Sequence, residues 1–301
     1  MVSDRTREVV RDARRCAVTR VARRLIVLCM VIATAATAGA QQAEASWGAS
    51  TGLAVGANPL VVGATGSATR TIPLYPQRSG VLWDNARVEL GAQLLANPSF
   101  TDLAARVYFE PIAPFDLTLR SGVRTFYNAL DLGAAPLSGY DASPPSAAGD
   151  DYNGQNETGW FFGVAPRLKA AAGPVIVTNT FTATWYDFSG SDTAFLEEPL
   201  TITAASRTDW VLENEAQLLY RFREVDASFL ASGVTHRSAW VPSADQPVSQ
   251  RSALLGVYVA ELTPRTSLQS VLFLGAYING EPIDTDRPFV LAALTLISRL
   301  D

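Results

Sequence analysis

The only histidine of the chain, His236, lies two residues before Ser238, and the two side chains together could do covalent chemistry. In an extended strand, side chains two residues apart share a face, so the imidazole could take the serine proton during attack on an ester. Gln250 and Asp245 are the polar residues that could orient the imidazole ring. A lone histidine near the end of a strand has the same appearance in sequence. We expect no catalytic residue, with lipid acyl hydrolysis as the alternative.

A second group of candidate residues is a cluster of oxygen-bearing side chains: Asp150, Asp151, Asn153, Asn156 and Glu157, with Gly154 among them. Calcium binds carboxylate and carbonyl oxygens, but the twelve-residue spacing of a calcium loop is missing. The sequence contains no zinc spacing, phosphate-binding loop or nucleotide-binding glycine motif. We therefore expect a solvated acidic loop, with no metal and no cofactor.

Most other charged residues belong to segments in which apolar and polar side chains alternate. In residues 102–110, for example, Leu103, Val107 and Phe109 alternate with polar positions that include Arg106 and Glu110. Charges of both signs therefore gather on one face of these segments. The residues concerned are Arg87, Glu89, Arg106, Glu110, Arg120, Arg124, Arg167, Lys169, Asp209, Glu213, Glu215 and Arg221.

The alternation continues for nine to thirteen residues, which is the length of a tilted membrane strand, whereas strands of soluble sheets average about five or six. Ten strands are predicted, at about 82–94, 102–110, 115–127, 160–169, 174–188, 209–221, 225–238, 250–262, 267–279 and 288–300. Residues 41–80 supply either a first hairpin, at about 47–57 and 60–72, or an N-terminal extension. We favour the hairpin and hence about twelve strands, with ten as the alternative.

The connections between these strands alternate in length. Short ones lie at 111–114, 173–174, 223–226 and 263–266, and longer, acidic ones at about 130–158, 189–206, 241–249 and 280–287. Short turns belong on the periplasmic side of a membrane barrel and long loops outside. With this orientation Trp160, Trp185, Trp210 and Trp240 form one aromatic row at the outer edge, as expected where hydrocarbon meets headgroups.

The first forty residues are typical of a signal peptide. Eight arginines precede the apolar run 25–40, which is shorter than a spanning helix and ends in the small residues Ala38, Gly39 and Ala40. Removing residues 1–40 would take away eight of 24 basic and three of 29 acidic residues, leaving 16 and 26, a net charge of −10. Such a chain does not favour nucleic acid. Cys16 and Cys29 would leave with the signal, and residues 41–301 are expected to form one barrel.

The alternation, the loop pattern and the tryptophan row together resemble the bacterial outer-membrane β-barrels of the porin-like group. The resemblance implies an antiparallel transmembrane barrel surrounded by outer-membrane lipid and lipopolysaccharide. Charges in such a barrel must face the lumen, because lipid does not tolerate them.

Two arrangements of the lumenal charges stay open. The charges could pair across strands and fill a structural barrel. Alternatively, an arginine wall, comprising Arg106, Arg120, Arg124 and Arg167, could face an acidic wall of Asp209, Glu213 and Glu215 and leave a narrow pore for small polar solutes. A surface receptor or adhesin that acts through the acidic loops is a third function compatible with the sequence.

Overall fold

The computed structural model describes residues 45–57, 61–127, 135–137, 156–188, 193–198, 201–205, 208–225, 228–242, 246–280 and 288–300 of the 301-residue chain. Within these ranges, no helix is long and apolar enough to cross a membrane. The signal peptide predicted at 1–40, most of the acidic cluster at 150–157, and Asp245 lie outside the described residues. The expectations for them stay predictions.

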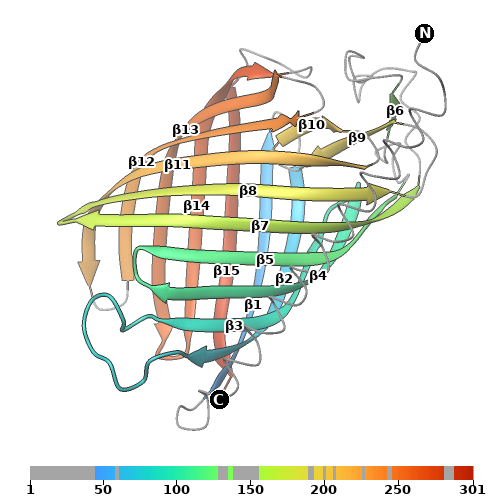
Figure 1. The fold of residues 1–301 in the computed structure, drawn as a ribbon. Coiled ribbons are helices and arrows are strands. Elements are labelled where there is room, and N and C mark those ends of the chain that lie inside the picture. The colour runs from blue at the N-terminus through green and yellow to red at the C-terminus, as the bar shows by residue number, and fades with distance from the viewer. Residues whose placement is uncertain are drawn as a thin grey trace.

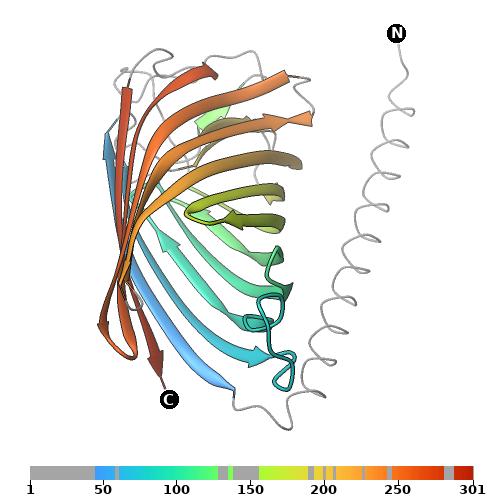
Figure 2. The same ribbon diagram turned by 90° about the vertical axis from the view of Figure 1, so that its left-hand side faces the viewer.

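Twelve long antiparallel strands close into one barrel (Figures 1 and 2). Their bounds are β1 Ser46–Ala57, β2 Val61–Pro73, β3 Arg87–Ala96, β4 Phe100–Ile112, β5 Phe115–Phe126, β7 Glu157–Ala172, β8 Val175–Phe188, β11 Thr208–Val225, β12 Ser228–Val241, β13 Gln246–Thr263, β14 Thr266–Gly280 and β15 Pro288–Leu300. Strands of 10 to 18 residues suit a tilted crossing of a bilayer. The prediction of an all-β barrel of twelve strands is confirmed.

The first hairpin closes the barrel, because β1 pairs with β2 on one side and with the last strand, β15, on the other. The register with β15 runs from Trp47 opposite Leu300 to Ala57 opposite Val290. Residues 46–73 therefore belong to the barrel wall and do not form an N-terminal extension, which decides for twelve strands over ten.

The two ends of the barrel differ. One end, the turn end, carries the tight turns at 173–174 and 264–265 and the start of β1. The other, the loop end, carries a small sheet of β6 Ala135–Leu137, β9 Thr193–Glu198 and β10 Thr201–Ala205, and β10 lies against β11, β12 and β13 (Figure 1). The sequence does not predict these three short strands, because at three to six residues they are too short for alternation to identify them.

Aromatic side chains lie at both ends of the exterior, as a row across β7, β8, β11 and β12 at one end and as a pair on β11 at the other. The row near the loop end consists of Trp160, Trp185, Trp210 and Trp240, and Trp185 and Trp210 are register partners. Nearer the turn end, Tyr220 and Phe222 are exposed, with ring centroids 5.1 Å apart. Between the row and the pair lie exposed apolar side chains such as Leu218. This banded exterior is the kind that membrane barrels present to lipid.

The expectation that a strand begins at residue 82 is wrong, because residues 74–86 form a loop and β3 begins only at Arg87. Gly80 has φ +125°, which other residues rarely adopt, and its amide donates to Asp84 Oδ1 at 2.8 Å. Trp83 packs edge-on against Tyr75, with ring centroids 5.2 Å apart. These local contacts hold the segment in a turn although its side chains alternate.

Candidate pore interior

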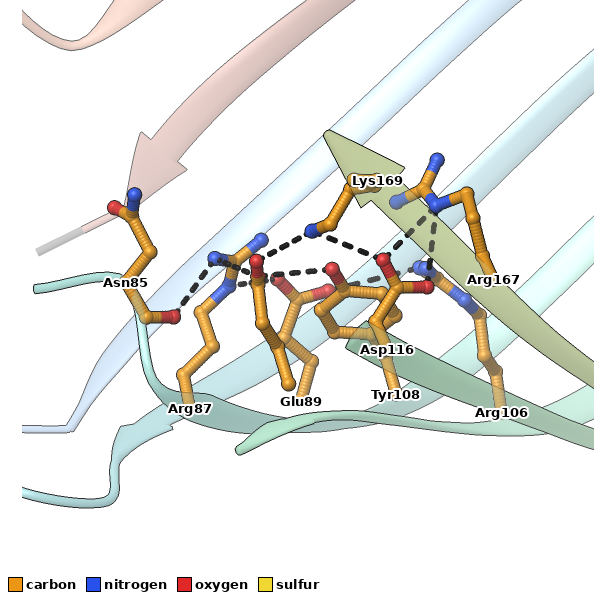
Figure 3. Close-up of polar contacts among 9 residues, drawn as sticks. Asn85, Arg87, Glu89, Arg106, Tyr108, Asp116, Arg167 and Lys169 are labelled. Atoms are coloured by element: carbon orange, nitrogen blue, oxygen red, sulfur yellow. Dashed lines mark hydrogen bonds and ion pairs between the residues drawn. The ribbon is translucent and has the colours of Figure 1, made fainter. Parts of the chain in front are cut away.

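A network of ion pairs occupies the turn end of the interior along β3, β4, β5 and β7 (Figure 3). Glu110 is at its centre and accepts from Arg87 Nη1 at 2.6 Å, Lys169 Nζ at 2.5 Å and Tyr108 Oη at 2.9 Å. Arg87 Nε also donates to Glu89 at 2.8 Å. Because Glu110 is buried, these donors replace the water that its carboxylate loses.

Asp116 on β5 anchors the second half of the network. Its buried carboxylate accepts from Arg167 Nε at 2.9 Å and lies 3.0 Å from Lys169 Nζ. Arg106 reaches Glu89 at 3.7 Å and so extends the network toward the middle of the barrel (Figure 3). Each carboxylate here has a cation beside it, so this part of the wall is nearly neutral.

Arg124 also points inward, but near the loop end and out of reach of water. Its Nε and Nη2 donate to Asp102 at 2.6 and 2.7 Å, and its guanidinium carbon lies 4.2 Å from the Phe100 ring centroid. The Arg124 side chain is 3% exposed. The expectation that Arg124 lines the pore is therefore corrected: it forms an enclosed ion pair inside the wall.

Apolar side chains pack around this ion pair and fill that region of the interior. Phe126 lies 5.6 Å from both Phe100 and Phe188, measured between ring centroids. We call the whole set the aromatic constriction; its members are Phe100, Ala104, Phe126, Phe161, Tyr186, Phe188, Val211 and Val241. All of them are buried, so solvent does not enter between them.

A cavity of about 550 Å³ lies next to the aromatic constriction and reaches the middle of the barrel. Its charged lining consists of Arg106, Arg120, Arg237, Glu213 and Glu215. Most of the remaining lining carries hydroxyl groups, from Ser50, Thr65, Ser67, Thr118, Thr180, Thr182 and Thr184. Such a lining offers both donors and acceptors to water and to small polar solutes.

A second cavity, of about 580 Å³, lies at the turn end and is lined by Arg87, Glu89, Thr295 and Arg299 among others. Ser50, Ser67 and Arg106 line both cavities, so the two adjoin. Polar space thus continues from the middle of the barrel to the turn end, whereas the buried side chains of the aromatic constriction occupy one half of the interior wall toward the loop end.

Arginines face one another across two strand pairs of the interior. Arg106 is the register partner of Arg120, and Arg237 is the register partner of Arg251. Like charges placed directly opposite destabilise a sheet. One member of each pair has a carboxylate, because Arg106 lies 3.7 Å from Glu89 and Arg237 contacts Glu213.

The other member of each pair has no such carboxylate. Among the described residues, Arg120 and Arg251 form no ion pair, and their guanidinium groups instead lie 6.0 Å from the Phe161 ring and 5.5 Å from the Phe289 ring. Arg120 reaches the central cavity, while Arg251 lies beside a much smaller cavity together with Glu215. Fixed positive charge therefore remains at the edge of the polar space.

The expected walls of opposite charge need correction at two of their arginines. Arg124 and Arg167 are bound by Asp102 and Asp116 of the same wall, so they add little net field across the lumen. The charge contrast that remains lies in the central cavity, between Arg120 on β5 and Glu215 on β11, because Glu213 is paired with Arg237.

Asp209 and Arg221, at the two ends of β11, share the inward face without lining either cavity. Asp209 is the register partner of Tyr186, which lines the central cavity, and Arg221 is the partner of the buried Ala231. Apart from Arg124, the other predicted pore-lining residues divide between the central cavity, the turn-end cavity and the ion-pair network.

His236 and Ser238 lie on the exterior of β12, since Thr235 and Arg237, which alternate with them, line interior cavities. The His236 Nδ1 atom lies 2.9 Å from Ser252 Oγ on β13, its register partner. The imidazole therefore bonds to a serine outside the predicted pair. Among the described residues, its ring makes no hydrogen bond to Gln250.

Several interior residues carry too weak a signal in the sequence to have been predicted, chiefly the threonines of β8. Thr178, Thr180, Thr182 and Thr184 alternate strictly, but uncharged hydroxyls say little about which face points inward. Arg237 and Arg251 were also missed, although Arg237 was detectable, because it follows His236 on the opposite face of an alternating strand.

Comparisons with known proteins show only distant similarity to solved structures. No protein-family model matches the chain, and no curated protein sequence matches it. Similar solved structures include the translocator domain of the autotransporter NalP from Neisseria meningitidis, with 12% identity over 96% of this chain and 98% of that chain and a TM-score of 0.38. The beta domain of the Bordetella autotransporter BrkA has 10% identity over 85% and 98%, with a TM-score of 0.44. An outer membrane channel from Pseudomonas putida F1 has 14% identity over 85% and 95%, with a TM-score of 0.40.

Proposed function

We propose that the protein is a narrow pore of the bacterial outer membrane that passes small polar solutes and prefers anions weakly. The observation that carries this proposal is the polar space formed by the two adjoining cavities, with Arg120 at its wall. Among the described residues, Arg120 forms no ion pair with a carboxylate. In a purely structural barrel, a guanidinium that lies beside water and opposite another arginine would not stabilise the fold.

The exterior supports the membrane location. Aromatic side chains lie at both ends of a belt of exposed apolar side chains, while the interior holds the charges, and a soluble protein rarely exposes so much apolar surface. Lipid and lipopolysaccharide of the outer membrane would then surround the barrel, and the loop end with β6, β9 and β10 would face outward.

The decisive experiment is the conductance of purified, refolded protein in a planar bilayer. We expect small, discrete steps, because twelve strands leave a narrow bore and the aromatic constriction narrows it further. A protein that inserts and yet never conducts would be a structural barrel, and the pore proposal would fail.

Selectivity tests the role of Arg120. In a salt gradient, Arg120→Ala should shift the reversal potential toward cations, since removing fixed positive charge lowers the barrier to them. Arg120→Lys, which keeps the charge, should leave the reversal potential near that of the unchanged protein. An identical potential in all three proteins would mean that ions do not pass Arg120.

A further inference from the structure

The exterior of β8, β11, β12 and β13 carries an unusual group of neutral polar side chains in the middle of the apolar belt. We call this group the outer polar patch; it consists of Asn179, Asn214, His236, Ser238, Gln250 and Ser252. The strand register arranges them in two neighbouring rows: Asn214, Ser238 and Gln250 lie side by side, and His236 is directly opposite Ser252. Asn179 continues the second row beyond Ala216.

The patch lies at the depth of the hydrocarbon if the barrel spans a membrane as proposed above. Trp240 of the outer aromatic row is two residues beyond Ser238 and four beyond His236 on the same face of β12. At about 3.3 Å per residue and a tilt of about 40°, His236 lies roughly 10 Å deeper than Trp240. On the other side of the patch, Val234 and Leu254 are exposed and apolar.

The polar groups of the patch only partly satisfy one another. Asn179 and Asn214 exchange two amide hydrogen bonds, at 3.2 and 3.1 Å, and His236 bonds to Ser252. Within the part of the chain that the structure describes, the side chains of Ser238 and Gln250 make no hydrogen bond. Hydrocarbon offers no partner to such groups, so leaving them in contact with acyl chains is unfavourable.

The remainder of the exterior shows that this patch is local. On β1, β14 and β15 the exposed outward side chains include Leu53, Leu272, Leu294 and Val290. A wall of this kind suits acyl chains. Among the described strands, the outward amide and imidazole side chains are thus concentrated on one side of the barrel, which gives the molecule a distinct lateral face.

The composition of the patch favours another protein surface over a lipid headgroup. It has no lysine, arginine or carboxylate, so it offers no charge for a phosphate group. Its amides and hydroxyls each donate and accept hydrogen bonds, and a surface with that property can satisfy a copy of itself across a two-fold axis. Ser238 of one copy and Gln250 of the other are suited to such an exchange.

We propose that the outer polar patch is the interface through which two copies of this barrel associate side by side in the membrane. This inference rests on the proposed membrane location but not on conduction, so a barrel that does not conduct could still dimerise through this surface.

Cysteine cross-linking in native membranes tests the interface. The full chain with Cys16→Ser and Cys29→Ser has no other cysteine, so a single Ser238→Cys reports on this face alone. Mild oxidation should give a disulfide-linked dimer for Ser238→Cys and only monomer for Leu294→Cys on β15, three strands away from β12 around the barrel. Equal cross-linking at both positions would indicate random collision and would overturn the proposal.

A second measurement is needed because the two introduced cysteines could lie too far apart in the dimer to form a disulfide. Sedimentation in mild detergent should give a dimer for the unchanged protein and a monomer for the variant Ser238→Leu with Gln250→Leu, which keeps the fold and removes the unpaired polar groups. A monomeric unchanged protein would contradict the proposal. So would lipid that purifies with the unchanged monomer and is lost from the variant, since the patch would then bind lipid.

Discussion

At the scale of single residues, the enclosed ion pair of Arg124 and Asp102 is the strongest candidate for a stabilising contact of the interior. Both side chains are buried, and the Arg124 guanidinium is held between two carboxylate hydrogen bonds and the Phe100 ring. Removing one partner of a buried pair leaves a buried charge, which costs more than the pair contributes when both partners are present.

Arg124→Ala should therefore lower the free energy of unfolding by about 3 to 5 kcal/mol. The measurement is urea unfolding of refolded protein in lipid vesicles, followed by tryptophan fluorescence. Arg167→Ala is the matched control: its partner Asp116 keeps Lys169 at 3.0 Å, and the Arg167 side chain is 39% exposed. We expect that control to lose about 1 kcal/mol or less. An equal loss of unfolding free energy in both variants would mean that the burial of the Arg124 ion pair does not determine the cost of breaking it.

The His236 and Ser252 pair allows a second test at this scale. The 2.9 Å contact would suit proton transfer from a serine nucleophile, but ester hydrolysis also needs donors that stabilise the oxyanion. Of the amide side chains in the outer polar patch, Asn179 and Asn214 bond to each other, which leaves Gln250 as the single amide donor beside Ser252.

We therefore expect refolded protein to release no fatty acid from phospholipid or lipopolysaccharide, with or without calcium. Release that is abolished in both His236→Ala and Ser252→Ala, while Ser238→Ala stays active, would instead establish a hydrolase with Ser252 as its nucleophile.

At the scale of strands, alternation assigns each residue of β15 to lipid or lumen. Leu294 is exposed on the exterior, and the next residue, Thr295, lines the turn-end cavity. Leu294→Arg should cost about 2 to 4 kcal/mol if the position is near the middle of the bilayer. Thr295→Arg should assemble nearly as well as the unchanged protein, because water reaches it. Heat-modifiable gel migration and urea unfolding measure both; a greater loss for Thr295→Arg would invert the face assignment.

Most strands are predictable from the sequence, because a period of two sustained over ten or more residues is typical of membrane strands and rare in helices and loops. The start of β3 is not, since the turn at Gly80 and the contact of Trp83 with Tyr75 are local features that alternation does not report. Within a hairpin, partners follow from the turn: Asp102 is opposite Arg124, at a position set by the connection between β4 and β5.

Contacts between strands that are not neighbours are harder to predict. Lys169 on β7 reaches Glu110 on β4 across the intervening strand β5. That contact depends on the curvature of the closed barrel, which no pattern within a single strand reports. The sequence therefore predicts the inward charges of the ion-pair network but does not predict which of them pair.

At the scale of the whole molecule, the polar space is asymmetric along the barrel axis. The two adjoining cavities run from the middle to the turn end, and the aromatic constriction lies on the loop-end side of them along β4, β5, β7, β8, β11 and β12. In a pore, resistance is dominated by the narrowest segment. The constriction, and not the charged network, should therefore limit conductance, while Arg120 below it affects which ions pass.

Phe188→Ala tests this division. Phe188 is 2% exposed and packs against Tyr186 at 5.9 Å and Phe126 at 5.6 Å between ring centroids, so its removal opens space in the constriction. We expect larger single-channel steps with an unchanged reversal potential, at a stability cost of about 3 to 5 kcal/mol. Phe222→Ala, which removes an exposed ring from the lipid-facing exterior, should change neither step size nor reversal potential. If Phe188→Ala folds and its steps equal those of the unchanged protein, the narrowest segment lies elsewhere. If its reversal potential also changes, the constriction contributes to ion selectivity. The assignment of conductance to the constriction and of selectivity to Arg120 would then be wrong.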